Sequence, residues 1–342
     1  MFNELLQNNV ITYLNISEIK KTFAQPYRLS FGRDNTLLSL SIESAGILCP
    51  ILVRTNTNKY DIEIIAGFRR MEVASSLGIE KIPCILIPSE KISTLNAFFL
   101  NLYDNIAIRE FNEVEKALAI RFLVENKISY QKITSEYLPL LGIPPKNKYI
   151  DLYFTISNSS LKLKEALVSE RISVKTFDRL LKLPISCQYI VSDLMFKLKF
   201  NINQQLQLVE FTEIIVEKND EENALTEISK IEHEIIASSF LSDPQKINAI
   251  LAHLKAMIYP SFSVSKKRFK NAVSSINIPE KVKITHPPFF ELSSYSMEIN
   301  FSSGKELDSI FKKFQHQNIA EKLPDPLDFD ESPDELSISM EN

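Results

Sequence analysis

The sequence predicts an α+β protein, and three observations predict it. Short apolar runs and apolar–polar alternation, which are typical of strands, occur in the first 90 residues and again between residues 281 and 301. Helical periodicity dominates the stretch between them. At 342 residues the chain is long enough for two or three domains. We therefore expect a small α/β N-terminal domain, an all-α middle domain and a small α/β C-terminal unit.

The N-terminal elements follow from apolar spacing punctuated by glycine. Gly46 and Gly78 stand where helices are expected to end, and Gly67 permits a turn that a β-branched residue would resist. The expected elements are a short strand near residues 14–19, a helix over 37–45, strands over 50–54 and 60–65, a helix over 71–77 and a strand over 82–87.

Two adjacent arginines, Arg69 and Arg70, follow the Gly67 turn and fall in the first turn of the next helix. Free backbone N–H groups and the helix dipole favour an anion at such a point. This pattern predicts a phosphate site. Arginines after a turn also serve as surface charges or as partners of local carboxylates, and that interpretation stays open here.

Composition bounds the class of protein. The three cysteines, Cys49, Cys84 and Cys187, lie far apart and lack metal-ligand spacing, which favours a reducing cytoplasm. No apolar run approaches the roughly 20 residues that span a bilayer, and the first residues do not resemble a signal peptide. We expect a soluble, cytoplasmic protein. The net charge is −4, yet residues 111–200 carry 14 basic against 9 acidic side chains, which suggests a polyanionic partner for that segment.

That basic segment has the pattern of a helix-turn-helix. We expect helices over residues 112–125, from Ser129 onward, and over 146–157, with a Gly-Ile-Pro-Pro turn before the third helix. In the third helix the core face is Ile150, Tyr153, Phe154 and Ser157, and the outward face is Lys146, Asn147, Lys148 and Asp151.

The outward face is the candidate DNA-reading surface. We expect Asn147 to contact a base edge and the two neighbouring lysines to neutralise phosphates, whereas the charge of Asp151 opposes this. The alternative is a plain helical hairpin with a solvated basic end. Further candidate phosphate contacts lie C-terminal to it: Lys162, Lys164, Arg171, Lys175 and Arg179.

The rest of the chain is less informative about function. We expect helices over 203–215 and 224–240, strands over 281–285 and 295–301, and a helix from Ser303 whose capping box uses Glu306 and whose buried stripe is Leu307, Ile310, Phe311 and Phe314. An acidic, proline-containing tail is expected to be disordered. The expected domains are 1–110, 111–217, a helical linker over 218–256, 257–320 and the tail over 321–342.

The order of these elements and motifs resembles the ParB partition family, over roughly the first 215 residues. The matching segments are Ser41-Ile42-Glu43 with Gly46-Ile47, Pro50-Ile51-Leu52-Val53-Arg54, Ile64-Ile65-Ala66-Gly67-Phe68-Arg69-Arg70 with Leu77-Gly78 and Ile82-Pro83, and Asp104-Asn105-Ile106-Ala107-Ile108-Arg109. The third segment is similar to the family's Gly-Glu-Arg-Arg motif. The fourth is similar to its Glu-Asn-Leu-Gln-Arg segment.

The resemblance implies a DNA-binding protein of chromosome or plasmid partition, with a CTP-dependent clamp switch. By position it implies CTP binding by Gly67, Arg69, Arg70, Asn105 and Arg109, and Mg²⁺ binding by Asp104 and Asn105. It also implies double-stranded DNA and a partition ATPase as partners, a homodimer, a nucleoid-associated location in the cytoplasm and at most a weak CTPase activity.

Three positions depart from the family pattern: Phe68 replaces the motif glutamate, Asp104 is one methylene shorter than its glutamate, and Arg109 lies one residue later. One residue along a helix turns a side chain by about 100°, which argues that Arg109 misses its place. An alternative for Asp104 and Asn105 is a helix cap followed by exposed polar residues.

Two other functions stay open. Some proteins with this N-terminal fold are nucleases, and Asp61, Glu63 or Asp104 are then the candidate metal ligands. A transcriptional regulator keeps the fold without nucleotide or chemistry. The related sulfiredoxin activity is excluded, because Phe68 stands nearest the position of the nucleophilic cysteine and no thiolate replaces it.

Overall fold

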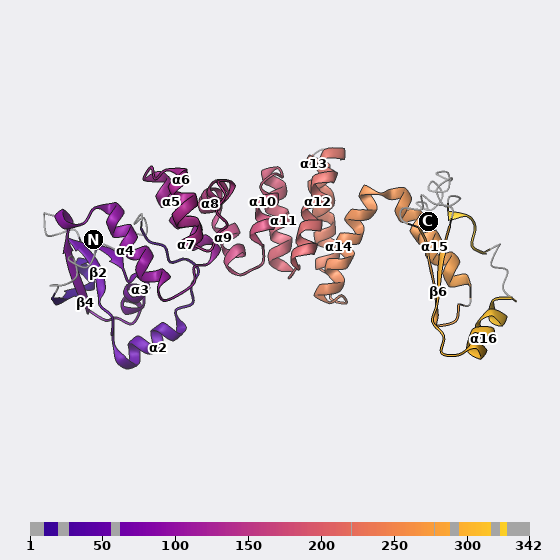
Figure 1. The fold of residues 1–342 in the computed structure, drawn as a ribbon, viewed down its shortest axis with the longest axis horizontal. Helices are drawn as coiled ribbons and strands as arrows, with labels where there is room; N and C mark the ends of the chain where they lie inside the picture. Colours follow the sequence, from indigo (N-terminus) through magenta and orange to yellow (C-terminus); the bar gives the residue numbers. More distant parts are fainter. Residues whose placement is uncertain are drawn as a thin grey trace. The chain divides into compact units, whose positions relative to one another are not determined.

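The computed structural model describes residues 10–19, 27–55, 62–219, 221–276, 278–287, 294–315 and 322–326 (Figure 1). The chain divides into two compact units, Met1–Asp178 and Arg179–Asn342. Each unit is described by itself. None of the helices in the described part of the chain is both long and apolar enough to span a bilayer.

The described strands of the first unit form a four-stranded sheet in the order β1-β4-β2-β3. These strands are β1 (Ile11–Asn15), β2 (Ile51–Thr55), β3 (Ile62–Ala66) and β4 (Lys81–Pro88). β4 pairs antiparallel with β1 and parallel with β2, and β2 pairs antiparallel with β3. Each strand was expected from the sequence to within a few residues, although Tyr60 and Asp61 lie outside the described residues.

Three helices accompany this sheet: α2 (Thr36–Ala45), α3 (Phe68–Ser76) and α4 (Thr94–Ile106). Short 3-10 turns, η1 (Ile16–Glu18) and η2 (Ser89–Lys91), follow β1 and β4. α3 begins at Phe68, three residues before the predicted start, because Gly67 with φ of 99° already ends the strand segment. Ile65 and Ala66 of β3 pack with Ala97 and Leu100 of α4, which brings α4 against the sheet.

The remaining helices of this unit carry the predicted helix-turn-helix. α5 (Glu113–Glu125) packs against α8 (Lys148–Asn158) and α9 (Leu161–Val168). Between them α6 (Tyr130–Lys132) continues through a π turn, η3 (Ile133–Tyr137), into α7 (Leu138–Leu140). α10 (Val174–Leu180) lies at the boundary of the two units.

The second unit contains the helices α11 (Ile185–Lys197), α12 (Ile202–Asn219), α13 (Glu221–Ile231), α14 (Asp243–Ile258), α15 (Pro260–Ser275) and α16 (Gly304–Gln315), a π turn η4 (Glu232–Ile236), and the antiparallel strands β5 (Val282–Thr285) and β6 (Ser296–Ile299). The predicted helix over 224–240 was too long, because its α-helical part ends at Ile231 and a π turn follows.

Two details of the C-terminal prediction also need correction. Phe311 was expected in a buried stripe, but 49% of it is exposed, and only Ile310 of that stripe is buried. The capping box is displaced by one residue: Ser303 Oγ accepts from the Glu306 N–H, whereas the Glu306 carboxylate accepts from the Ser302 N–H at 2.6 Å. The tail beyond residue 326 lies outside the described residues.

An aromatic stack joins the sheet domain to the helical region. The rings of Phe98 in α4 and Phe122 in α5 have centroids 3.9 Å apart and planes 12° apart, and both side chains are buried. A buried aromatic pair of this kind contributes packing energy beyond its buried area. The stack therefore fixes α4 against α5.

Replacing Phe98 by alanine is expected to lower the free energy of unfolding by about 3–5 kcal/mol, because it leaves a cavity in a closed core. Leu37→Ala is the matched control: Leu37 is 78% exposed on α2, and its loss should cost less than about 0.5 kcal/mol. Because the sequence has no tryptophan, urea denaturation is best followed by far-UV circular dichroism. Equal effects of the two variants would contradict the described packing.

Candidate functional site

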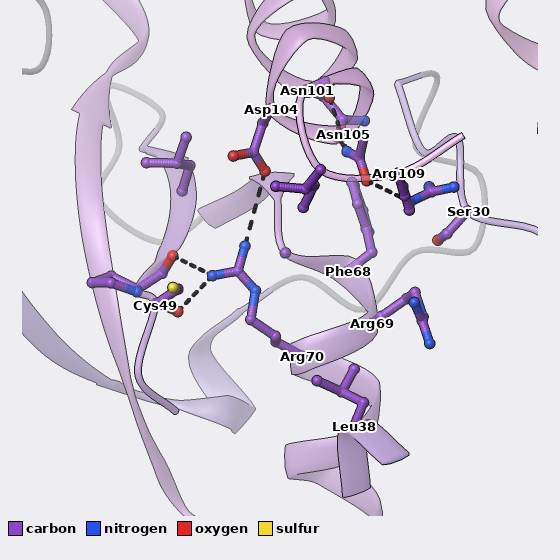
Figure 2. A pocket seen from close by; sticks show the side chains of 14 residues that line it. Ser30, Leu38, Cys49, Phe68, Arg69, Arg70, Asn101, Asp104, Asn105 and Arg109 are labelled. Atoms are coloured by element: carbon purple, nitrogen blue, oxygen red, sulfur yellow. Dashed lines mark hydrogen bonds and ion pairs between the residues drawn. The ribbon is translucent and has the colours of Figure 1, made fainter. Parts of the chain in front are cut away.

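A cavity of about 480 Å³ opens where β2, the Gly67 turn, the end of α4 and the following linker meet (Figure 2). The sequence-predicted ligand and metal residues, which lie far apart in the chain, all line it: Gly67, Arg69, Arg70, Asp104, Asn105 and Arg109. The fold thus brings the Gly-Phe-Arg-Arg turn and the Asp-Asn segment to one place.

Arg70 crosses one side of this pocket and is held by the protein itself. Its Nη1 donates to the carbonyls of Cys49 at 2.5 Å and Pro50 at 2.9 Å, and its Nη2 lies 4.0 Å from the Asp104 carboxylate. Gly67 makes this possible, because a Cβ there would lie 3.1 Å from the Ile51 side chain and 3.2 Å from Arg70 Nη2. The positive φ at Gly67 adds a second reason for glycine.

Arg69 points away from Arg70 in Figure 2 and is held from the other side of the pocket. Its Nε donates to Asn35 Oδ1 at 2.9 Å and its Nη2 to the carbonyl of Asp34 at 2.5 Å. Burial, followed by the positive charges of Arg109 and Arg33, lowers the pKa of the Arg69 guanidinium below its usual value. Such mutual repulsion shows that positive charge is concentrated here.

The last turn of α4 supplies the polar side chains opposite the arginines. Asn105 Nδ2 donates to Asn101 Oδ1 at 2.7 Å and to the Asn101 carbonyl at 2.9 Å, and Asn105 Oδ1 accepts from Arg109 Nε at 3.2 Å. The alternative of an N-terminal helix cap is wrong for Asp104 and Asn105, because α4 begins at Thr94, with Ser93 as its cap. The C-terminal end of a helix favours cations instead.

Arg109 lies three residues beyond the end of α4 at Ile106, and its backbone N–H still donates to the Asn105 carbonyl at 3.1 Å. Its Nη1 donates to Glu115 Oε2 at 2.6 Å, and its guanidinium lies 4.9 Å from the centre of the Phe111 ring. The displaced arginine is therefore in the pocket lining after all.

Glu115 in α5 is fully buried and collects several donors. It accepts from Arg33 Nη2 at 2.5 Å, from Arg109, and from the N–H of Asn112, with which it forms a capping box. Burial by itself raises the pKa of a carboxyl, but the hydrogen bonds from Arg33 and Arg109 outweigh it and leave the pKa of Glu115 below its usual value.

Two polar atoms of the pocket lack hydrogen-bond partners. Among the described residues, Arg109 Nη2 and Ser30 Oγ are the buried side-chain atoms for which no partner is found, and both residues line this pocket. Buried donors without partners are costly and call for an explanation such as a bound ligand. An anion in the pocket would satisfy them and would offset the charge of Arg33, Arg69 and Arg109.

Phe68 occupies the position of the family's motif glutamate and behaves as a core residue. Its ring is buried, lies 6.3 Å from the Tyr27 ring and carries the Arg28 guanidinium at 5.8 Å. The pocket therefore lacks an acid at this position. Cys84, which the sequence placed in a strand, is also buried, and burial raises the pKa of its thiol to about 11.

The donor set fits Mg²⁺ only together with phosphate oxygens. Among the described residues no group of three or more His, Cys, Asp or Glu side chains lies close enough to hold a metal. Asp104 is 43% exposed, whereas Asn105 Oδ1 already accepts from Arg109. Mg²⁺ usually binds one or two carboxylates plus substrate phosphates and water, and Asp104 suits that arrangement.

Of the other two residues proposed for nuclease chemistry, Glu63 is described and does not line the pocket with Asp104. Glu63 accepts from Tyr27 Oη at 3.0 Å and from Arg54 Nη2 at 2.5 Å. Asp61 lies outside the described residues.

The predicted DNA-reading residues are exposed at the start of α8. The helix begins at Lys148 rather than at Lys146, so Lys146 and Asn147 belong to the turn before it. Asn147 Oδ1 accepts from Thr134 Oγ1 at 2.6 Å, which leaves its amide N–H groups facing outward for other acceptors. Asp151 accepts from Tyr130 Oη at 3.0 Å, and Tyr153 lies on the buried side as expected.

The other predicted phosphate contacts differ in their surroundings. Lys162 and Lys175 are exposed, Arg171 is half-buried, and burial followed by the charge of Arg121 lowers the pKa of the half-buried Lys164. Arg179 belongs to the second unit, where it pairs with Glu213 at 2.9 Å and Glu210 at 3.4 Å.

Comparison with known proteins assigns the N-terminal part of the chain. Residues 3–106 match the ParB N-terminal domain family. This segment is a ParB N-terminal domain. A probable chromosome-partitioning protein ParB of Vibrio cholerae is 27% identical over 198 residues, which is 57% of this chain and 64% of that protein. A nucleoid occlusion protein of Bacillus cereus is 30% identical over 172 residues, which is 43% of this chain and 58% of that protein.

The ParB match is therefore partial, because the chain spans less than two thirds of the length of these relatives. A probable chromosome-partitioning protein ParB of Coxiella burnetii is 36% identical over 97 residues, which is 32% of that protein. Solved ParB structures from Caulobacter crescentus include one complexed with CTP-γ-S, 20% identical with a TM-score of 0.25, and one complexed with the centromeric parS site, 18% identical with a TM-score of 0.34. They cover 55% and 58% of this chain and 99% and 98% of those chains. TM-scores this low establish no common architecture.

Several residues in and around the pocket were not found from the sequence. Ser30, Arg33 and Asn35 lie between the first strand and α2, where no periodic pattern marks them. Glu115 had a local signal, because Asn112 followed three residues later by glutamate is a capping box. Asn101 had no local sequence signal, because an asparagine among apolar residues does not indicate which residues it will contact.

The low pKa of Glu115 predicts how stability depends on pH. A carboxyl whose pKa is lower in the folded than in the unfolded state contributes stability above its unfolded value, near 4.3, and loses it as the pH falls through the folded pKa. We expect Glu115→Gln to have a lower free energy of unfolding than the wild type at pH 7. Below about pH 4 the two free energies of unfolding should approach each other. Urea midpoints at both pH values test this; Glu43→Gln, exposed on α2, should match the wild type at each.

Proposed function

We propose that this chain is a ParB-family partition protein that binds CTP with Mg²⁺ in its N-terminal pocket and double-stranded DNA through its helix-turn-helix. One observation supports nucleotide binding: the positive charges of Arg33, Arg69 and Arg109 influence one another, and Arg109 Nη2 and Ser30 Oγ have no hydrogen-bond partner among the described residues. Such a site has more positive than negative charge and is built for an anion.

A triphosphate suits the pocket better than a single phosphate. The cavity of about 480 Å³ is in the range of small-molecule sites, and Arg70 and Arg109 reach it from different elements. Guanidinium groups suit phosphate because their N–H donors form a planar fork. CTP is the first nucleotide to test because the resemblance of residues 64–70 and 104–109 to the ParB motifs implies it.

Mg²⁺ would enter this site with the triphosphate. Asp104 is the carboxylate of this chain available to it, and the ion would neutralise phosphate charge beside Arg70. Among the described lining residues Asp104 is the only acid, and it already faces Arg70, so we propose nucleotide binding with at most slow turnover.

DNA binding is supported by the exposed basic residues at the helix-turn-helix. Lys146, Asn147 and Lys148 stand at the turn and first residues of α8, the place from which such helices enter the major groove. We place Lys162, Lys164, Arg171 and Lys175 as phosphate contacts of the same region. The ion pairs of Arg179 make it the weakest member of the predicted set.

The relatives support a second candidate function, nucleoid occlusion, which is the name of the Bacillus relatives. Both functions need DNA binding. The homodimer, the partition ATPase and the nucleoid-associated cytoplasmic location follow from the family resemblance and remain part of this proposal. A transcriptional regulator, the third alternative, would differ from both because it would need no nucleotide.

Nucleotide binding is tested by isothermal titration with CTP, ATP, GTP and UTP in the presence of Mg²⁺. We expect CTP to bind, and Arg69→Ala and Arg109→Ala each to weaken binding by about 10- to 100-fold, as the loss of a charge-assisted hydrogen bond predicts. Arg121→Ala on α5, outside the pocket, is the control and should bind like the wild type. No heat with any triphosphate would refute the site.

DNA reading is tested by selecting bound fragments from random DNA. Asn147→Ala should change the selected sequence, whereas Lys146→Ala and Lys148→Ala should weaken binding to all sequences and lower the salt slope by about 0.9 for each phosphate that the variant no longer neutralises. Lys91→Ala, an exposed lysine of the sheet domain, is the control. The reading surface is ruled out if Asn147→Ala and Lys148→Ala both keep the wild-type preference and affinity.

A further inference from the structure

We infer that Glu115 is a positioning residue through which an occupied pocket stiffens the start of α5. Glu115 does not line the pocket; it acts through Arg109, which does. The inference rests on the proposed function and describes the regulation of that same site.

The carboxylate of Glu115 joins three segments of the chain. It binds Arg33 from the segment before α2, Arg109 from the linker after α4, and the N–H of Asn112 at the start of α5. Its side chain is 0% exposed, so water does not compete for these bonds. A shift of Arg109 would therefore move the Glu115 carboxylate and, through it, the N-terminus of α5.

Two hydrogen bonds orient the Arg109 guanidinium, and its third nitrogen has no partner among the described residues. Nε donates to Asn105 Oδ1 at 3.2 Å and Nη1 to Glu115 Oε2 at 2.6 Å. Nη2 is buried and has no partner among the described residues. A phosphate oxygen that accepts from Nη2 thus adds a bond without displacing Glu115, because the guanidinium fork donates in several directions at once.

Arg109 also borders a second cavity, of about 430 Å³, on the side of the helical region. This cavity is lined by Lys116 of α5 and by residues 139–142, which are the end of α7 and the start of the turn before α8. Arg109 therefore lies between the pocket and the helix-turn-helix, and the linker from 109 to 112 is the covalent part of the same connection.

An anion on Nη2 should restrain Arg109, and Glu115 and Asn112 with it. The expected consequence is slower opening of residues 109–117 when nucleotide is bound. Without the Glu115 carboxylate, Arg109 loses one of its two fixed bonds, so nucleotide binding should weaken and the effect on α5 should disappear.

The test combines two measurements on the full chain with CTP and Mg²⁺: isothermal titration and amide hydrogen exchange of segment 109–117. The wild type should bind, and the segment should exchange at least threefold more slowly with nucleotide. Glu115→Gln should bind at least tenfold more weakly and lose the slowing. Glu113→Gln is the matched control, because it makes the same change two residues away, where Glu113 contacts Tyr153 and Lys116, and it should behave like the wild type.

The outcomes separate this inference from the proposed function. If the wild type binds CTP but the exchange of 109–117 is unchanged, the coupling is wrong and the nucleotide site stands. The same holds if Glu115→Gln binds as tightly as Glu113→Gln. If the wild type binds no triphosphate, both proposals fail. The wild-type exchange measurement needs no variant, so it decides the matter even if Glu115→Gln does not fold.

Discussion

The first unit depends on one buried carboxylate among guanidinium groups. Glu115 is fully enclosed, and a lone buried charge would be strongly unfavourable without its hydrogen bonds from Arg33, Arg109 and the α5 cap. Those bonds fix the ends of three segments that are distant in sequence. The pocket lining on one side and the first helix of the helix-turn-helix on the other follow from that arrangement.

The pocket itself results from a tight strand-to-helix turn. Gly67 takes a backbone conformation that other residues resist, and the space where its side chain would lie is occupied by Arg70. Arg69 and Arg70, adjacent in sequence, are thereby held by different segments on different sides of the cavity. Neutral carbonyl and amide oxygens accept the printed hydrogen bonds of both guanidinium groups, and the Asp104 carboxylate lies 4.0 Å from Arg70.

Much of the fold could be predicted from the sequence because glycine and alternating apolar residues mark the strands and α2. α4 was not predicted, because residues 97–103 are apolar at every position except Asn101 and a nearly continuous apolar run shows no helical period. For the site, motif order located Gly67, Arg69, Arg70, Asn105 and Arg109. The roles of Ser30 and Arg33 depend on contacts between segments more than 70 residues apart, for which one sequence holds no pattern.

The π turn η3 sets the rotation between α6 and α7. A π turn holds one residue more than an α turn, so the helix before it is rotated by about 100° relative to the helix after it. Tyr137 lies in this turn, and its ring stacks on Phe99 of α4 with centroids 5.5 Å apart. Deleting one residue from this turn would rotate Tyr137 away from Phe99, so a contact with α4 fixes the spacing between α6 and α7.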